Sequence, residues 1–470
     1  MSNNSFVAKL DKRFGFTAAG STLRTEIVAG ITTFFAMVYI LMVNAGMFTA
    51  IPGVSYGAIY IATAISAVVG TVAIGLLANL PLAQASGMGL NAFFVYTCVL
   101  GFGMSYANAL VLVLFDGILF IILTATGLRK MIFQAIPKVV RAAIPAGIGL
   151  FIAFLGLQNV GIVAKDASTG VTLASFNLLK QSWGTIMPMA VTLIALIAIT
   201  VMAKKNVKGS VLIGIVGGAV LYYVLGFLTV GGFNAGISMD SPFAAFGEFF
   251  SGSFFKVFTE GFDFSGYIAA NGAGNTVLVI VTTALAFCMV DMFDTMGTLY
   301  GACARGNMLT KEGDIPNMDK AMLADAIATT AGAVCGTSTV TTFVESSAGV
   351  AAGGRTGLSS MVTAALFFIA MFLSPVAQLV PTCATAAALV YVGVLMVACV
   401  KDIDWHDGEE ALPAFLTMAM MPFTYNISYG ICFGLLAYVC IKLFTGKVKE
   451  ITAGTWVITA LFLAMLLLTH

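Results

Sequence analysis

Charged residues are scarce in this chain of 470 residues: 9% are Asp, Glu, Lys or Arg, whereas 60% are hydrophobic. An ordinary soluble domain contains about 25% charged residues, and a soluble fold cannot hide so large an apolar surface from water. The net charge is +1 and no basic run occurs, which excludes a nucleic-acid-binding protein. Disorder and a coiled coil are excluded by the same composition. The sequence therefore predicts an all-helical polytopic membrane protein.

Metal-binding and nucleotide-binding motifs are also lacking. The only two histidines are His406 and His470, and the eight cysteines show no CxxC spacing. We therefore expect no metal centre, no cofactor and no disulfide framework. The GxxxxGK[ST] motif is missing, so an ATP-driven pump is not expected. Residues 1–24 are polar and do not resemble a cleavable signal peptide, so the first apolar run is expected to act as the insertion signal.

Apolar runs suited to membrane spans, which need about 20 residues, occur in two sets of seven. An acidic, Gly- and Phe-rich stretch at 231–273 separates the sets, and a surplus run at 452–469 is either a fifteenth span or a helix in the membrane plane. Seven spans on each side of an outside loop predict an inverted repeat, because an odd number of spans reverses the orientation of the second half. The runs are 26–48, 57–79, 87–100, 106–127, 138–156, 185–203 and 208–229, then 276–300, 319–335, 343–353, 357–378, 383–400, 411–421 and 425–444.

Positive charges indicate the orientation. Lys and Arg cluster at the N-terminus and then after even-numbered spans, which predicts a cytoplasmic N-terminus and an outside 231–273 stretch. A multi-pass protein of the plasma (inner) membrane is expected. The later clusters are Arg129, Lys130, Lys138 and Arg141; Lys204, Lys205 and Lys208; Arg305, Lys311 and Lys320; Arg355; Lys401; and Lys442, Lys447 and Lys449.

The third run of each half is short and interrupted by glycine, at 83–91 and at 341–349. Matching short segments in the two halves indicate a binding site near the membrane midplane, although chance is an alternative in a chain with 50 glycines. Residues 336–344 are rich in Thr, Val and Ser, which favours a short extended segment. We expect two short extended segments that lead into half-helices, one in each of these short runs. The second half-helix is expected to begin at Glu345, where the carboxylate either caps the helix or also accepts ligand N–H groups.

Five acids, Asp116, Asp291, Asp294, Asp325 and Glu345, lie within predicted spans, and no Lys or Arg lies at a comparable depth. Such acids must be protonated, hydrogen-bonded or hydrated. Because removal from water favours the neutral form of a carboxyl group, these acids are candidate proton carriers.

Asp291, Asp294 and Thr298 share one helix face with Phe287, a turn earlier. Two acids, a hydroxyl and an aromatic ring suit a flat heterocycle by hydrogen bonding and stacking. The alternative is that the acids line a hydrated cavity while the phenylalanine only packs. Uncharged candidates for the site are Gln84, Asn91, Ser346 and Thr33, although such side chains also bridge helices. Asp325 and Asp116 are expected to be mainly structural, with Asp325 tuning the other acids.

Three motifs stand out in the chain: Gly87–Phe94, Val290–Thr298, and Glu345–Val350 followed by Gly354–Gly357. Together they resemble the nucleobase–cation symporter-2 superfamily, in its adenine/guanine/hypoxanthine permease branch. This resemblance implies a seven-plus-seven inverted-repeat fold, with a base bound between a core and a gate domain and with dimerisation through the gate domain. It places Asp294, Glu345, Asp291 and Asn91 at motif positions linked to the site and Asp325 in support. Thr32 to Phe35 contain no histidine, unlike span one of the uracil and xanthine branches.

The apolar runs and the resemblance together divide the chain into segments. The first is a cytoplasmic N-terminus at 1–25, and the last is an extra apolar helix at 452–469. The core domain comprises 26–127 and 276–378, the gate domain comprises 138–229 and 383–444, and 230–275 form an extracellular loop.

We expect a secondary active transporter that imports a purine base with a proton by alternating access. The base preference is not predicted, because one or two side chains reverse such preferences. An anion transporter of the same fold for sulfate or bicarbonate is the main alternative, but an anion should meet helix N-termini and a cation rather than several acids. A membrane-embedded enzyme and an acid-lined channel are less favoured.

Overall fold

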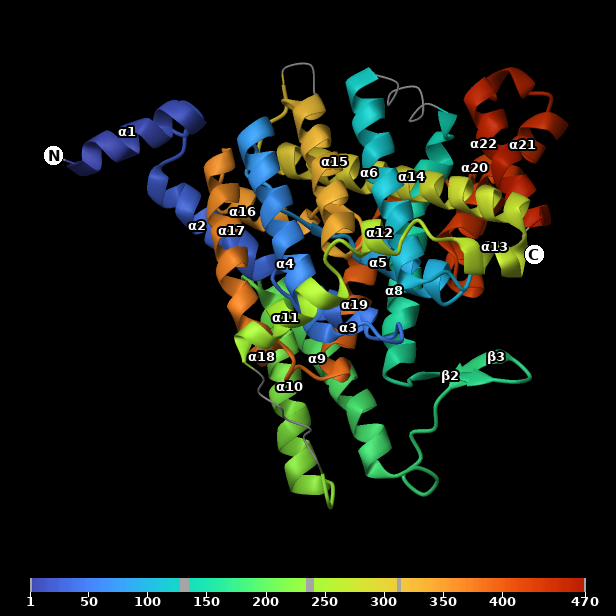
Figure 1. Ribbon diagram of the computed structural model, residues 1–470, viewed down its shortest axis with the longest axis horizontal. Coiled ribbons are helices and arrows are strands. Elements are labelled where there is room, and N and C mark those ends of the chain that lie inside the picture. Colours follow the sequence, from blue (N-terminus) through green and yellow to red (C-terminus); the bar gives the residue numbers. More distant parts are fainter. Residues whose placement is uncertain (1, 127–134, 234–240, 311–313, 469–470) are drawn as a thin grey trace.

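The computed structural model describes residues 2–126, 135–233, 241–310 and 314–468. Ten helices in these ranges are long and apolar enough to cross a membrane. Four further predicted spans do not meet that criterion. Helix α15 carries three charged residues, α20 has only 17 residues, and the other two are the short half-helices. The predicted seven-plus-seven architecture is therefore the one found (Figure 1).

The first half begins with a surface helix, and its first span is broken between α2 and α3. Short π-helical segments at Ile74–Ala78 and Phe93–Val99 continue α4 and α5. The elements are α1 (Ser2–Phe14), α2 (Leu23–Met37), α3 (Ile40–Phe48), α4 (Tyr56–Ala73), β1 (Gln84–Ser86), α5 (Met88–Ala92), α6 (Tyr106–Thr126), α8 (Lys138–Asn159), β2 (Val163–Asp166), β3 (Gly170–Leu173), α9 (Trp183–Lys204) and α10 (Ser210–Thr229).

The second half follows three short helices, which replace the loop expected at 231–273. Single 3-10 turns occur at Val344–Ser346, Met371–Leu373, Ala398–Asp402 and Val448–Glu450. The elements are α11 (Pro242–Gly252), α12 (Lys256–Thr259), α13 (Ser265–Asn271), α14 (Ala273–Arg305), α15 (Met318–Cys335), β4 (Val340–Thr342), α16 (Ser347–Ala351), α17 (Gly357–Ala370), α18 (Ser374–Ala377), α19 (Thr382–Val397), α20 (Gly408–Thr424), α21 (Ile427–Phe444) and α22 (Ala453–Leu468).

Strands β1 and β4 join the two halves at the centre of the bundle. They pair antiparallel, with Ala85 opposite Thr341. Two backbone bonds extend the pairing symmetrically: Gly87 N donates to Thr339 O at 3.0 Å, and Phe343 N donates to Ala83 O at 3.0 Å. This arrangement has the local two-fold symmetry of an inverted repeat, and it confirms the prediction of two extended segments that lead into half-helices. Extended backbone is tolerated at this depth because protein buries it on all sides.

Two groups of helices pack mainly within themselves. Helices α2, α4, α6, α14, α15 and α17 form one group, and α8, α9, α10, α19, α20 and α21 form the other. The backbones of α8 and α19 approach closely at Gly149 and Gly393, since a Cβ atom added to Gly149 would lie 2.6 Å from Gly393 O. Only glycine fits such an approach. Spans 5 and 12, which correspond in the two repeats, therefore meet through a pair of glycines.

The segment between the halves covers one end of the bundle. Helix α11 packs against α4, and α12 packs against α6 and α15. In Figure 1 the three helices α11, α12 and α13 pass across the front of the spans. Asp240, an acid of this stretch, lies outside the described residues, as do Arg129, Lys130 and Lys311 of the predicted positive clusters.

Helix α22 runs back along α21. Thr455 Oγ1, near its start, donates to Ala135 O at 2.6 Å, and Leu468, at its end, lies beside the turn between α20 and α21. It also packs against α14. Of the two possibilities for 452–469, this course favours a helix parallel to the spans.

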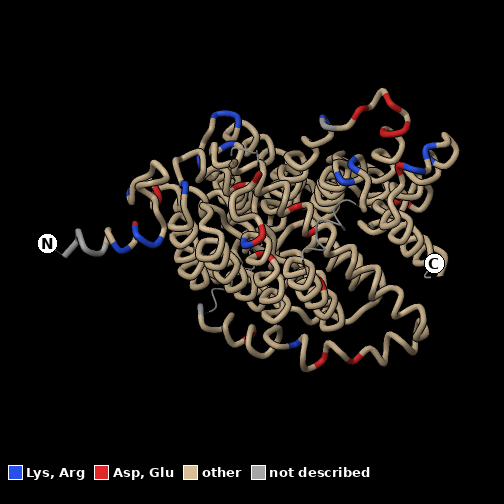
Figure 2. The backbone as a smooth tube through the Cα atoms, turned by 90° about the horizontal axis from the view of Figure 1, so that it is seen from above, with Lys and Arg blue, Asp and Glu red and all other residues tan. Residues whose placement is uncertain are grey.

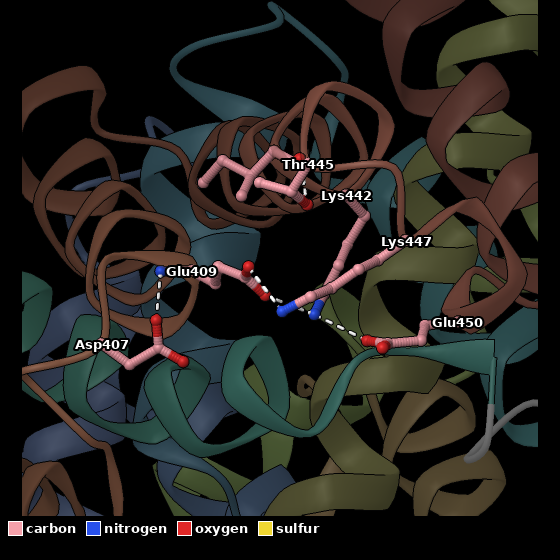
Figure 3. A network of polar contacts seen from close by, with 7 residues as sticks. Asp407, Glu409, Lys442, Thr445, Lys447 and Glu450 are labelled. Atoms are coloured by element: carbon pink, nitrogen blue, oxygen red, sulfur yellow. Dashed lines mark hydrogen bonds and ion pairs between the residues drawn. The ribbon is translucent and has the colours of Figure 1, made fainter.

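An ion-pair cluster holds the connection between α21 and α22 (Figure 3). Lys442 Nζ lies 2.7 Å from Glu409 Oε2 and 2.7 Å from Glu450 Oε2, and Lys447 Nζ lies 2.7 Å from Glu409 Oε1. Figure 2 shows that the trace is otherwise mostly uncharged, with several acidic positions inside the bundle.

Candidate functional site

Glu345 lies in the 3-10 turn that joins β4 to α16, as predicted for the start of the second half-helix. Its Oε1 accepts a hydrogen bond of 2.5 Å from Tyr39 Oη. Tyr39 is fully buried and lies at the break between α2 and α3. A hydrogen bond to a charged group is worth about 1.5–3 kcal/mol, so this contact fixes the direction of the carboxylate.

A small cavity brings Glu345 together with two of the predicted residues on α14. The cavity has a volume of about 60 Å³ and is lined by Asp294, Thr298 and Glu345. Gly87 and Gly89, at the start of the first half-helix, also line it. Thr341 of β4 is a hydrogen-bond partner of Asp294. Two carboxyl groups from different spans of the second repeat therefore face the half-helix of the first repeat.

A larger cavity of about 730 Å³ also reaches Glu345. Small-molecule sites usually have about 300–1,000 Å³, so the larger cavity has room for a ligand and the smaller one does not. Thr32 and Tyr391 lie along its wall. A ligand in this cavity would meet Glu345, whereas Asp294 lines only the small cavity.

Three cationic residues, Lys208, Arg305 and Arg355, line the same larger cavity. Arg305 Nη1 donates to Ser347 Oγ at 3.1 Å. Arg355 Nη1 donates to the carbonyl oxygens of Val350 and Gly354 at 2.8 and 2.7 Å. Both arginines are therefore bound to the segment around α16, and they stabilise the backbone that follows Glu345.

The two strands and the half-helices are held together by three of the predicted polar residues, namely Gln84, Asp325 and Ser346. Gln84 Nε2 donates to Asp325 Oδ1 at 2.9 Å and to Thr342 Oγ1 at 3.1 Å. Ser346 Oγ accepts a hydrogen bond from Ala83 N at 3.0 Å. These side chains connect the repeats, whereas Glu345 and Asp294 face the cavities.

Asn91, Phe287 and Thr33 lie outside both cavity linings. Asn91 Oδ1 accepts a hydrogen bond from Ser86 Oγ at 2.9 Å. Phe287 is fully buried against Phe93, with 4.8 Å between the ring centroids. Thr33 is buried against the backbone of α16, and its Oγ1 has no hydrogen-bond partner among the described residues. Their roles in substrate binding stay predictions.

A second group of acids lies behind the strands. Asp116, Asp291 and Asp325 are fully buried on α6, α14 and α15. Each accepts a hydrogen bond from one threonine, and each keeps a second carboxyl oxygen without a hydrogen-bond donor in the described part of the chain. The bonds are Thr339 Oγ1 to Asp116 Oδ2 at 3.3 Å, Thr329 Oγ1 to Asp291 Oδ2 at 3.1 Å and Thr295 Oγ1 to Asp325 Oδ1 at 2.8 Å.

These three acids lie close enough to interact electrostatically with one another. None of the ion pairs between described residues involves these acids. The structure therefore places Asp291 in a buried acid cluster with Asp325 and Asp116, away from the cavity lined by Asp294.

Sequence reasoning missed Tyr39, Thr341 and Tyr391 as site residues. A tyrosine within an apolar span is a usable signal, because a buried hydroxyl needs a partner. Its partner Glu345, 306 positions away, is not identifiable from spacing.

Comparison with known proteins agrees with this architecture. A model of the family described as "Permease family" matches residues 24–433. The guanine/hypoxanthine permease PbuO of Bacillus subtilis (strain 168) is 39% identical over 95% of this chain and 98% of its own length. The adenine permease AdeQ of Escherichia coli (strain K12) is 34% identical over 98% of this chain and 96% of its own.

Among solved structures, the transmembrane domain of the cyanobacterium bicarbonate transporter BicA superposes with a TM-score of 0.61 at 16% identity. The match covers 89% of this chain and 97% of that chain. This likeness shows the fold of core and gate, and nothing about the ligand. Together with the family model and the two relatives, it shows that this chain is a multi-pass membrane protein that belongs to the permease family.

Proposed function

We propose that this permease imports a purine nucleobase together with a proton. The observation that carries the proposal is the position of Glu345, which lines both the 730 Å³ cavity with room for a ligand and the small cavity that it shares with Asp294. A purine edge offers N–H donors, and carboxylate oxygens are strong acceptors for them. The two relatives named above are permeases for guanine and hypoxanthine and for adenine, which supports the same substrate class.

The buried acid cluster supports proton coupling. Asp291 and Asp325 are fully buried, each with one carboxyl oxygen that has no donor among the described residues, and Gln84 connects Asp325 to β1 at the centre of the fold. A movement of β1 and β4 during transport changes the surroundings of these acids. The cluster therefore supplies a proton-binding group close to the substrate site without competing for the base.

The proposed orientation places the N-terminus in the cytoplasm of a plasma-membrane protein. Lys208, Arg305, Lys442 and Lys447 then lie on the cytoplasmic side, in agreement with the preference of positive charge for that side. The 730 Å³ cavity then lies on this side, where Lys208 and Arg305 line it. Transport requires the core segments 26–127 and 276–378 to move against the gate segments 138–229 and 383–444.

Anion transport is the alternative that one observation favours, because Lys208, Arg305 and Arg355 line the larger cavity. The two arginines, however, bond to Ser347 and to backbone carbonyls. An anion at Glu345 would meet a like charge, which is costly in a site removed from water. The acids therefore favour a neutral, N–H-rich ligand.

Purified protein in proteoliposomes tests the proposal. We expect saturable uptake of labelled hypoxanthine, guanine or adenine, competition by unlabelled purines, no uptake of labelled sulfate, and loss of accumulation when an uncoupler collapses the proton gradient. Glu345→Gln is expected to abolish uptake. The matched control Glu260→Gln, which removes an exposed carboxylate paired with Lys256, is expected to keep it. Sulfate uptake would contradict the substrate class, and accumulation that follows sodium would contradict proton coupling.

A further inference from the structure

A second large cavity, of about 540 Å³, lies at the opposite end of α14. Asn275, near the start of α14, lines this cavity, whereas Arg305, at the end of the helix, lines the cavity that reaches Glu345. Thirty residues of α-helix separate these two positions by about 45 Å. In the proposed orientation this second cavity lies on the outer side of the membrane.

The inverted repeat relates the two cavities to each other. The inner cavity is lined by the turn between α9 and α10, and the outer cavity by the turn between α20 and α21, which is the corresponding turn of the second repeat. Asn206 (φ 57°) and Tyr425 (φ 55°) give both turns a left-handed residue. The end of the second half-helix borders the inner cavity, and the end of the first borders the outer one. The outer cavity is therefore the counterpart of the inner one on the other side of the transport path.

The two cavities differ in chemistry. Lys208, Arg305 and Arg355 line the inner cavity, whereas the lining described for the outer cavity contains no Asp, Glu, Lys or Arg. Aromatic and amide side chains dominate the outer lining instead. Four tyrosines contribute to it, namely Tyr96, Tyr267, Tyr425 and Tyr429.

Two of the three asparagines in the outer lining have fixed orientations. Asn271 Nδ2 donates to Tyr267 O at 3.1 Å, which directs its hydrogen-bond donor toward the backbone and leaves Oδ1 as an acceptor. Asn426 Oδ1 accepts from Ser428 N at 2.8 Å, which leaves its Nδ2 as a donor. An acceptor, a donor and aromatic faces in an uncharged cavity suit a flat, neutral, nitrogen-rich ring.

The outer cavity also contains a contact between the two groups of helices. Thr97 Oγ1, at the end of the first half-helix, donates to Tyr425 O at 2.7 Å. The Tyr425 ring packs edge-on against Phe151 and Phe154, with centroids 6.0 and 5.5 Å away. This contact therefore joins the first half-helix and the α20–α21 turn to α8 at the wall of the outer cavity.

We infer that the outer cavity is a second binding site, at which a neutral purine base is captured by stacking and amide hydrogen bonds before the path to Glu345 opens. The inference rests on the proposed function and orientation. According to this inference, Tyr267 and Asn271 contact the base only while it occupies the outer cavity. Neither residue lies near Glu345 or Asp294, so their effect on transport is separable from that of the main site.

Transport kinetics measured from each side test the outer site. In cells or oriented vesicles, Tyr267→Leu and Asn271→Ala are expected to raise the KM for external base about fivefold, the effect of one lost stacking or hydrogen-bonding contact. The maximal rate and the KM for base presented from inside are expected to stay unchanged. Tyr300→Leu, which alters an exposed tyrosine at the other end of α14, is the matched control. An unchanged external KM, or equal increases on both sides, would overturn the inference.

Chemical labelling gives a second measurement that does not depend on turnover. Asn275→Cys in a Cys440→Ser background introduces a thiol into the outer lining, and a membrane-impermeant maleimide is added from outside. We expect adenine, guanine or hypoxanthine to slow labelling even when Glu345→Gln has disabled the main site. No protection, or labelling only from inside, would refute the outer site. If the unaltered protein takes up no purine at all, the proposed function itself fails, and that result is distinguishable from a missing outer site.

Discussion

Tyr39 Oη donates a 2.5 Å hydrogen bond to Glu345 Oε1 and thereby links the break in the first span to the turn before the second half-helix. The two residues belong to different repeats and are 306 positions apart. Movement of either repeat changes this contact. The hydrogen bond therefore positions the carboxylate that lines both cavities and ties it to the break in the first span.

Tyr39→Phe removes this hydrogen bond while it keeps the ring that fills the core. Because a hydrogen bond to a charged group contributes about 1.5–3 kcal/mol, we expect the KM for purine uptake to rise about tenfold or more. Uptake kinetics in proteoliposomes measure the effect. Tyr222→Phe, at a partly exposed tyrosine on α10, is the control and should behave like the unaltered protein. A Tyr39→Phe variant with normal KM would show that Glu345 does not need this partner.

Asp325→Asn tests whether the buried acid cluster carries the coupled proton. The amide oxygen of Asn can still accept from Gln84 Nε2 and Thr295 Oγ1, which bond to Asp325 at 2.9 and 2.8 Å, but the side chain no longer exchanges a proton. We expect exchange of internal for external base to persist while accumulation driven by a pH gradient falls at least tenfold. Asp314→Asn serves as the control at a site outside the spans. Normal gradient-driven accumulation in the Asp325→Asn protein would exclude Asp325 as the proton carrier.

The sequence predicted the architecture better than it predicted the contacts. The odd number of spans in each half was sufficient to predict the inverted repeat. The Thr- and Val-rich stretch before Glu345 was sufficient to predict the extended segment. Helical spacing placed Asp291, Asp294 and Thr298 on one face, but residues three apart point about 60° away from each other. In the middle of a bundle that angle is enough to direct Asp294 to the cavity and Asp291 to Asp325 and Asp116. Such choices depend on neighbouring helices, which periodicity does not reveal.

Gly393→Ala tests the close approach of α8 and α19. A Cβ atom at Gly393 would collide with Gly149 O and with Ala153, so the helices must separate. Overpacking of this kind costs about 1–3 kcal/mol, and we expect a lower melting temperature and slower transport. Gly217→Ala on α10 is the matched control, because no atom lies within 4 Å of the added Cβ. Equal thermal stability of both variants in detergent would contradict the tight glycine contact.

Glu409→Gln tests the ion-pair cluster that holds the α21–α22 connection. Hydrogen bonds from Lys442 and Lys447 lower the pKa of Glu409 below its ordinary value. A carboxyl group whose pKa is lower in the folded than in the unfolded protein stabilises the fold above its unfolded pKa, and this contribution is lost as the pH falls through the folded value.

We therefore expect Glu409→Gln to lower the melting temperature at pH 7, and we expect the difference from the unaltered protein to shrink below about pH 4.3, where a free Glu becomes protonated. Added salt should reduce the difference at pH 7, because these side chains are partly exposed and ions screen them. Glu410→Gln, the neighbouring acid on α20 that takes no part in the cluster, controls for the loss of charge alone. A pH-independent difference, or the same difference for Glu410→Gln, would show that the lysine contacts of Glu409 do not stabilise the connection to α22.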